Sequence, residues 1–282
     1  MKRNHLNRAL RMTQGLLFAW LGLASVAAAQ PAAAQLPLIV IGASYAEGTT
    51  PFNNGVAPLG GIAVSFGSYR SLGAALARQP SMPGHVINEA QAGASTFARL
   101  ACGPTQCGPA GWDSYETQLT RALTRVTNPF TVPATVNAKY VVVTMANDCL
   151  HSDAAGLPQL QTAPCSYQQL DEVAARLVQV GQRALSAGLT PIFDVYPPYD
   201  RLDMLLFRQL FGLTWVIRPE AYNHLRNRSF EALSALPGAV VLDIWQGFKH
   251  RGDGLHPTDE TSDQAAQRIA EKVQALGASA GR

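Results

Sequence analysis

The chain has 282 residues, of which 47% are hydrophobic and 15% charged, and its formal net charge is +3 at pH 7. A chain of this length and composition can bury a large single core. It has no basic stripe with interleaved aromatic residues, so a nucleic-acid-binding surface is not expected.

The first segment resembles a secretory signal peptide. An apolar run, residues 15–28, is short for a membrane span, and Ala27–Ala29 offers a small-residue cleavage site. We therefore expect residues 1–29 to be removed on export, with a second cleavage site at Ala32–Ala34 and an uncleaved anchor as the alternatives. The basic residues of this leader are Lys2, Arg3, Arg8 and Arg11. Since it holds four cations and no acid, its removal changes the formal charge from +3 to −1, and the mature protein is expected to be periplasmic or secreted.

Short apolar runs alternate with helical patterns along the rest of the chain. The clearest, Tyr140–Met145, is β-branched and apolar on both faces, as a central parallel strand requires. This alternation predicts a three-layer, doubly wound α/β fold with a five-stranded parallel sheet. Without repeats or linkers, we expect one domain over residues 36–280. The five predicted strands are Leu36–Ile41, His85–Asn88, Tyr140–Met145, Thr190–Val195 and Ala239–Ile244.

Two helices are predicted with defined ends. For Ser166–Ala187, Ser166 and Gln169 form a capping box and Gly188 follows as a stop signal. The final helix is expected from about Ser262 to Leu276, with Gly277 after it.

Two segments are irregular. Residues 48–67 are rich in Gly, Pro and Asn, and we expect a long loop there. Leu202–Ile217 is strongly apolar and follows the fourth strand, so it is either a lid that contacts the acyl group or an ordinary core helix. In the first interpretation its aromatic side chains, Phe207, Phe211 and Trp215, bind substrate.

The four cysteines predict disulfides, because the count is even and export is expected. Three pairings are possible by count alone. We favour Cys102–Cys107 and Cys149–Cys165, since each closes a local loop. A zinc site is the alternative, but no C-x-x-C pair is present.

Residues suited to acyl transfer follow the predicted strands. Ser44 comes after the first strand, Gly93 after the second, and Asn147 after the third. The sequence Asp253-Gly-Leu-His256-Pro257 follows the fifth and combines a base with a carboxylate that can orient it. Because ligands bind outside the carboxyl ends of parallel strands, we expect a nucleophile, a base and oxyanion donors to meet there.

In these blocks the chain resembles the SGNH hydrolases, also called the GDSL esterase/lipase family. Gly42-Ala43-Ser44 with Gly48, Asn88 with Gly93, Asn147-Asp148, and Asp253 through Pro257 match the family's four blocks in order. The departures are Ala43 for Asp, Ala46 for Thr, Met145 for Gly, and a missing Gly after His256. None of them removes a catalytic group, although Met145 can narrow the site.

The resemblance implies a flavodoxin-like SGNH-hydrolase fold and an esterase without metal or organic cofactor. It assigns catalysis to Ser44, Asp253 and His256, and the oxyanion hole to the Ser44 N–H, Gly93 N–H and Asn147 side chain. The expected substrates are small-molecule or lipid esters, with transient contact to a lipid surface and no obligate protein partner. The alternatives are an O-acetyl esterase or O-acetyltransferase acting on polysaccharide, and a non-catalytic binding protein.

Overall fold

The structure is a computed structural model that describes residues 37–47, 70–82, 86–102, 107–152 and 163–280. The chain divides into two units, residues 1–34 and 35–282, and all described residues belong to the second. The expected leader and the expected loop at residues 48–67 lie outside the described residues. The leader, its cleavage and export therefore stay predictions.

A five-stranded parallel sheet organises the second unit. Its strand order is β2-β1-β7-β8-β9, the doubly wound order in which the first strand lies inside the sheet. The register aligns Leu38 with both Val86 and Tyr140, so the carboxyl ends of β2, β1 and β7 share one edge. All five predicted strands are present, with slightly shorter bounds: β1 Leu38–Ile41, β2 Val86–Asn88, β7 Tyr140–Val143, β8 Thr190–Asp194 and β9 Val240–Leu242.

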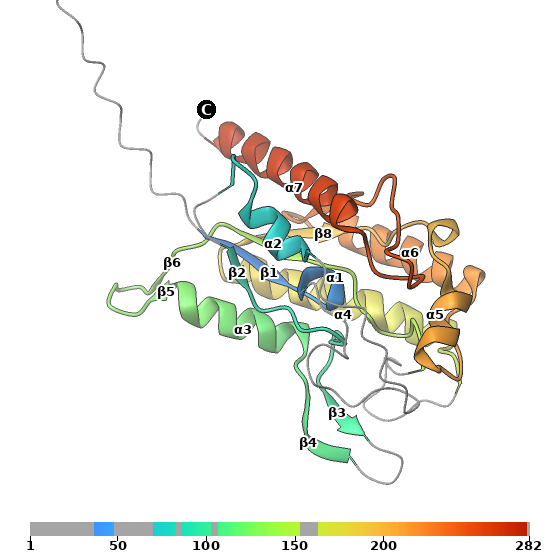
Figure 1. The fold of residues 1–282 in the computed structure, drawn as a ribbon. Coiled ribbons are helices and arrows are strands. Elements are labelled where there is room, and N and C mark those ends of the chain that lie inside the picture. The colour runs from blue at the N-terminus through green and yellow to red at the C-terminus, as the bar shows by residue number, and fades with distance from the viewer. Residues whose placement is uncertain (1–36, 48–69, 83–85, 103–106, 153–162, 281–282) are drawn as a thin grey trace, which may run out of the picture. The chain divides into compact units, whose positions relative to one another are not determined.

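Helices cover both faces of the sheet and complete three layers (Figure 1). Helix α2 (Leu72–Ala77) lies beside α7 (Asp259–Ala280) on one face. Helices α3 (Tyr115–Val126), α4 (Tyr167–Ser186) and α6 (Pro219–Ser234) lie on the other. The main core fills the space on either side of β1 and β7, whose residues are fully or almost fully buried. This confirms the predicted three-layer α/β fold.

The predicted capping box at Ser166 is present, because its hydroxyl accepts from the Gln169 N–H and the Gln169 side chain returns to the Ser166 N–H. The predicted bounds of the last helix were wrong. Helix α7 begins at Asp259, since Thr258 caps it through the Thr261 N–H. It also continues through Gly277, where a helical glycine costs only about 1 kcal/mol relative to alanine.

Smaller elements connect the main ones, and among them the two hairpins were not predicted. Two antiparallel hairpins pair β3 (Arg99–Cys102) with β4 (Cys107–Trp112), and β5 (Thr127–Asn128) with β6 (Thr135–Val136). A 3-10 turn, Tyr199–Arg201, and α5 (Met204–Phe211) follow β8. Among the helices of the described ranges, none is both long and apolar enough to cross a bilayer.

A disulfide, Cys149–Cys165, joins the loop after β7 to the start of α4, as predicted. Its sulfurs connect residues 16 apart in sequence. The backbone of Cys102 faces that of Cys107 across the β3–β4 hairpin, but their side chains lie outside the described part of the structure. The Cys102–Cys107 disulfide therefore stays a prediction.

Replacing both Cys149 and Cys165 by serine should lower the free energy of unfolding by ~3 kcal/mol, because the unfolded chain regains the freedom of the closed loop. Urea unfolding of wild type and of the double variant, each with and without reductant, measures this loss. Equal stability of the two oxidised proteins would contradict the expectation.

Candidate active site

The turn after β1 is shaped by Gly42. Its φ is +150°, and a Cβ at this position would lie 1.8 Å from Thr144 Oγ1 on the neighbouring strand, so only glycine fits. The Gln118 side chain accepts from the Gly42 N–H at 2.7 Å and donates to the Gly42 carbonyl at 3.1 Å. The turn delivers Ser44 as the first residue of the short helix α1 (Ser44–Glu47), which Asn88 of β2 contacts at the Ala46 carbonyl.

Ser44, His256 and Asp253 form a continuous line of hydrogen-bonded side chains. Ser44 Oγ lies 3.0 Å from His256 Nε2, and His256 Nδ1 lies 2.9 Å from Asp253 Oδ2. The three side chains are at most 6% exposed. The structure therefore brings together all three residues that the sequence suggested as catalytic, across 212 positions of sequence.

The Asp253 carboxylate is held from two sides. Its Oδ1 accepts from the backbone N–H groups of Leu255 at 3.0 Å and His256 at 2.8 Å, which leaves Oδ2 for the imidazole. Burial by itself raises the pKa of Asp253, but the His256 charge and these hydrogen bonds outweigh it and lower the pKa below its ordinary value. An ionised Asp253 favours the tautomer with the proton on Nδ1 and a free lone pair on Nε2, which faces Ser44.

Gly254 lets this loop approach α5. Its φ is +87°, and an added Cβ would lie 2.1 Å from the Asp203 carbonyl oxygen. The Asp203 N–H donates to the Gly254 carbonyl at 2.8 Å, while the Asp203 side chain caps α5 through the Leu206 N–H. The residue that caps the start of α5 is thus hydrogen-bonded directly to the loop of Asp253 to His256.

Gly93 and Asn147 lie in the turns after β2 and β7, at the same edge of the sheet as Ser44. Gly93 is buried and has a φ of +81°, which glycine adopts at little cost. Asn147 is 8% exposed, and its amide makes no hydrogen bond to any other residue in the described ranges. An amide N–H in this position is available to a ligand.

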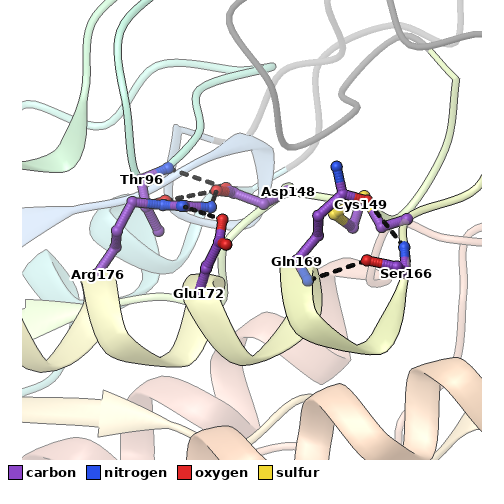
Figure 2. The surroundings of a disulfide bond; sticks show 8 residues. Thr96, Asp148, Cys149, Ser166, Gln169, Glu172 and Arg176 are labelled. Carbon is purple, nitrogen blue, oxygen red and sulfur yellow. Dashed lines mark hydrogen bonds and ion pairs between the residues drawn. A yellow bond between two sulfur atoms is a disulfide. The ribbon is translucent and has the colours of Figure 1, made fainter.

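A buried ion pair that sequence reasoning missed joins these two turns (Figure 2). Asp148, next to Asn147, accepts from the Thr96 N–H at 2.9 Å and from the Thr96 hydroxyl at 2.5 Å. Arg176 of α4 reaches Thr96 Oγ1 at 2.7 Å and Asp148 Oδ1 at 3.4 Å. Burial raises the pKa of Asp148, and the contacts with Thr96 and Arg176 oppose that rise. The turns bearing Gly93 and Asn147 are therefore positioned as one unit.

The apolar segment at residues 202–217 packs mainly into the core. Phe207 and Phe211 are 3% and 2% exposed, with ring centroids 4.4 Å apart. Phe207 also lies edge-on to His256, with centroids 5.9 Å apart, so it borders the site. Trp215 is buried and bonds through its carbonyl to the Ser152 N–H. Of the three residues expected to bind substrate, Phe207 is placed against the triad residue His256.

Other polar residues considered from the sequence have different surroundings. His250 accepts from the Gly252 and Gly254 N–H groups at 3.2 Å, which shapes the loop that carries His256. His151 is buried against Phe207, and His224 pairs with Asp171 at 2.8 Å. No cluster of three or more His, Cys, Asp or Glu residues suited to a metal ion occurs in the ranges that the structure describes.

A second buried carboxylate, Asp194, lies at the carboxyl end of β8. Its Oδ2 accepts from the Trp245 indole N–H at 2.9 Å. Burial raises the pKa of Asp194 to about 7, against the opposing effect of the Trp245 hydrogen bond. Sequence reasoning missed this pair, because no short motif links residues 51 positions apart.

Two esterases are among the solved structures that resemble this fold. Est24, a carbohydrate acetylesterase from Sinorhizobium meliloti, matches with a TM-score of 0.57 and 16% identity over 86% of this chain and 100% of its own. The inhibitor-bound aryl esterase of M. smegmatis matches with a TM-score of 0.56 and 16% identity over 86% of this chain and 99% of its own. No family model and no curated protein matches the chain. At these identities the likeness concerns the fold alone, which is the three-layer α/β arrangement around a parallel sheet that the sequence predicted.

Asp194 should make the stability of the protein depend on pH. Between about pH 4 and pH 7 the folded protein keeps the Asp194 proton while the unfolded chain, with an ordinary pKa of 3.8, loses it. The contribution of Asp194 to the free energy of unfolding is therefore fully present below about pH 4 and declines as the pH rises to about 7. Asp194→Asn keeps an acceptor for Trp245 but cannot ionise, so it should be more stable than wild type at pH 8 and similar to it at pH 4.5. Thermal unfolding at both pH values measures this, and an equal pH dependence of the two proteins would contradict it.

Proposed function

We propose that the protein is a serine esterase that hydrolyses carboxylic esters through Ser44, His256 and Asp253. The observation that supports this most directly is the 3.0 Å contact between Ser44 Oγ and His256 Nε2, with Asp253 behind the imidazole. A serine hydroxyl is a weak nucleophile until an adjacent base takes its proton. The likeness to esterase structures agrees with this chemistry.

In the first half of the reaction, Ser44 Oγ attacks the ester carbonyl carbon as His256 Nε2 takes the hydroxyl proton. Asp253 stabilises the imidazolium that forms, since it is ionised and bonded to Nδ1. The tetrahedral intermediate collapses by breaking the bond to the alcohol oxygen, which receives the proton from His256. In the second half, water attacks the acyl carbon as His256 takes a proton from it. The bond between the acyl carbon and Ser44 Oγ then breaks, His256 returns the proton to Ser44 Oγ, and the carboxylic acid leaves.

The oxyanion of the tetrahedral intermediate is assigned to three donors, namely the Ser44 N–H, the Gly93 N–H and the Asn147 side-chain amide. Their arrangement at one edge of the sheet supports this role, and the Asp148–Thr96–Arg176 cluster holds two of the three turns in place. Because these donors are fixed before charge develops, they stabilise the intermediate without reorganising.

The substrate class is proposed as acyl esters of lipids or small alcohols, acted on outside the cytoplasm. The edge of the Phe207 ring beside His256 supports an apolar acyl group near the nucleophile. An O-acetyl esterase or an O-acetyltransferase acting on polysaccharide is the second candidate, since the triad chemistry is common to all three. Est24, which has a similar fold, is described as a carbohydrate acetylesterase and so belongs to this second class.

Ser44→Ala should abolish esterase activity, because no other group replaces the nucleophile. A panel of p-nitrophenyl esters of increasing chain length, run beside acetylated xylan, measures activity and substrate class together. Ser95→Ala is the matched control: Ser95 is also a buried serine at this edge, and its variant should still react with a fluorophosphonate probe. Near-normal activity of folded Ser44→Ala would refute the nucleophile, and activity confined to xylan would favour the second candidate.

Asn147→Ala should lower kcat by ~10²–10³-fold with a small change in KM, since the amide is assigned to the intermediate and not to the bound ester. Steady-state kinetics on the best ester of the panel measure this. Asn223→Ala, on the exposed face of α6, is the control and should behave as wild type. A change in KM without a change in kcat would contradict the assignment of Asn147 to the oxyanion hole.

A further inference from the structure

One side chain links the segment that carries Ser44 to the loop that carries Asp253 and His256. Tyr45, the residue after Ser44, donates its hydroxyl proton to the Leu255 carbonyl at 2.5 Å, across 210 positions of sequence. Leu255 immediately precedes His256. A single hydrogen bond therefore runs from the residue beside the nucleophile to the peptide unit that carries the base.

The Leu255 residue is held at both of its polar backbone groups. Its N–H donates to Asp253 Oδ1 at 3.0 Å, and its carbonyl accepts from the Tyr45 hydroxyl. The first bond fixes the loop internally, and the second fixes the loop relative to α1. Helix α1 has only four residues, so its own backbone bonds give it little rigidity.

The Tyr45 ring is itself confined by two aromatic rings. Trp245 meets it edge-on with centroids 5.1 Å apart, and Phe248 stacks on it with centroids 5.9 Å apart and planes 15° apart. The Trp245 indole is in turn anchored to Asp194 at the end of β8. Tyr45 is 3% exposed. The position of its hydroxyl beside Leu255 is therefore fixed by packing against Trp245 and Phe248, and Trp245 is in turn hydrogen-bonded to β8.

We infer that Tyr45 is a positioning residue for the Ser44–His256 pair, which it holds at reacting distance through the Leu255 carbonyl. This rests on the proposed function. Proton transfer from Ser44 to His256 depends on a separation near 3 Å and on the orientation of the ring. Asp253 orients the ring but is on the same loop as His256, so it cannot set the distance to α1. The Tyr45 hydroxyl spans the two segments.

Tyr45→Phe tests this, because it keeps the aromatic packing and removes only the hydroxyl. The variant should react with a fluorophosphonate probe about tenfold more slowly than wild type, with the same final labelled fraction. Its kcat for an ester should fall by a similar factor while KM stays within about twofold. A purely structural role would lower the labelled fraction and leave the rate constant of the labelled molecules unchanged.

Tyr222→Phe is the matched control. Tyr222 is equally buried, and its hydroxyl also donates to a backbone carbonyl, that of Pro197 at 2.8 Å, without contacting the triad residues. Its variant should lose stability but label at the wild-type rate. Thermal unfolding of each variant establishes that it is folded at the assay temperature.

The outcomes separate this inference from the proposed function. If wild type is not labelled at Ser44, with Ser44→Ala as the blank, the proposed function fails. If wild type is labelled and Tyr45→Phe is labelled at the same rate, the esterase proposal stands and the positioning role of Tyr45 is overturned. If Tyr222→Phe slows labelling as much as Tyr45→Phe does, the effect is general loosening of the fold, and the inference is again overturned.

Discussion

The site depends on one geometric constraint, that the carboxyl end of β1 must meet the loop between β9 and α7. Ser44 and His256 are 212 residues apart, and their side chains come within 3.0 Å. The parallel sheet makes this meeting feasible, because β1 lies inside it and its neighbours end at the same edge. The sheet alone does not align the two segments to within a hydrogen bond. Direct contacts between them complete the alignment, including the hydrogen bond from Tyr45 to the Leu255 carbonyl.

Three buried carboxyl groups lie at this edge of the sheet, and each has different hydrogen-bond partners. Asp253 is surrounded by donors, so it is held ionised beside the imidazole. Asp148 accepts from Thr96 and Arg176 and ties two turns together. Asp194 has the Trp245 indole N–H, and its pKa rises to about 7. The pKa of Asp253 is lowered, whereas burial raises the pKa values of Asp148 and Asp194, so the direction of the shift separates the carboxylate that acts with the base from the two that support the fold.

Much of the fold was predictable, because burial leaves a direct mark on sequence. Tyr140–Val143 is buried on both faces and was recognised as a central strand from its β-branched residues. The helix after Ser166 was recognised from its cap, which is a local interaction. The predicted bounds of the last helix were wrong at both ends. Thr258 caps the helix ahead of the predicted start at Ser262, and the helix continues through Gly277. The segment at residues 202–217 could not be assigned to the core or to a lid, because an apolar helix has the same sequence pattern in both places.

The sequence by itself determined the order of the five sheet strands along the chain and the types of residue that follow them, including Ser44, Gly93, Asn147, Asp253 and His256. These are local properties, in which a short motif states which chemistry is available. Only the tertiary structure decided which side chains hold that chemistry in place. Tyr45, Thr96, Arg176, Asp194 and Trp245 act through contacts between segments far apart in the chain. A single sequence carries no signal for such contacts, because each of these residues is also an ordinary core or surface residue until the fold brings its partner to it.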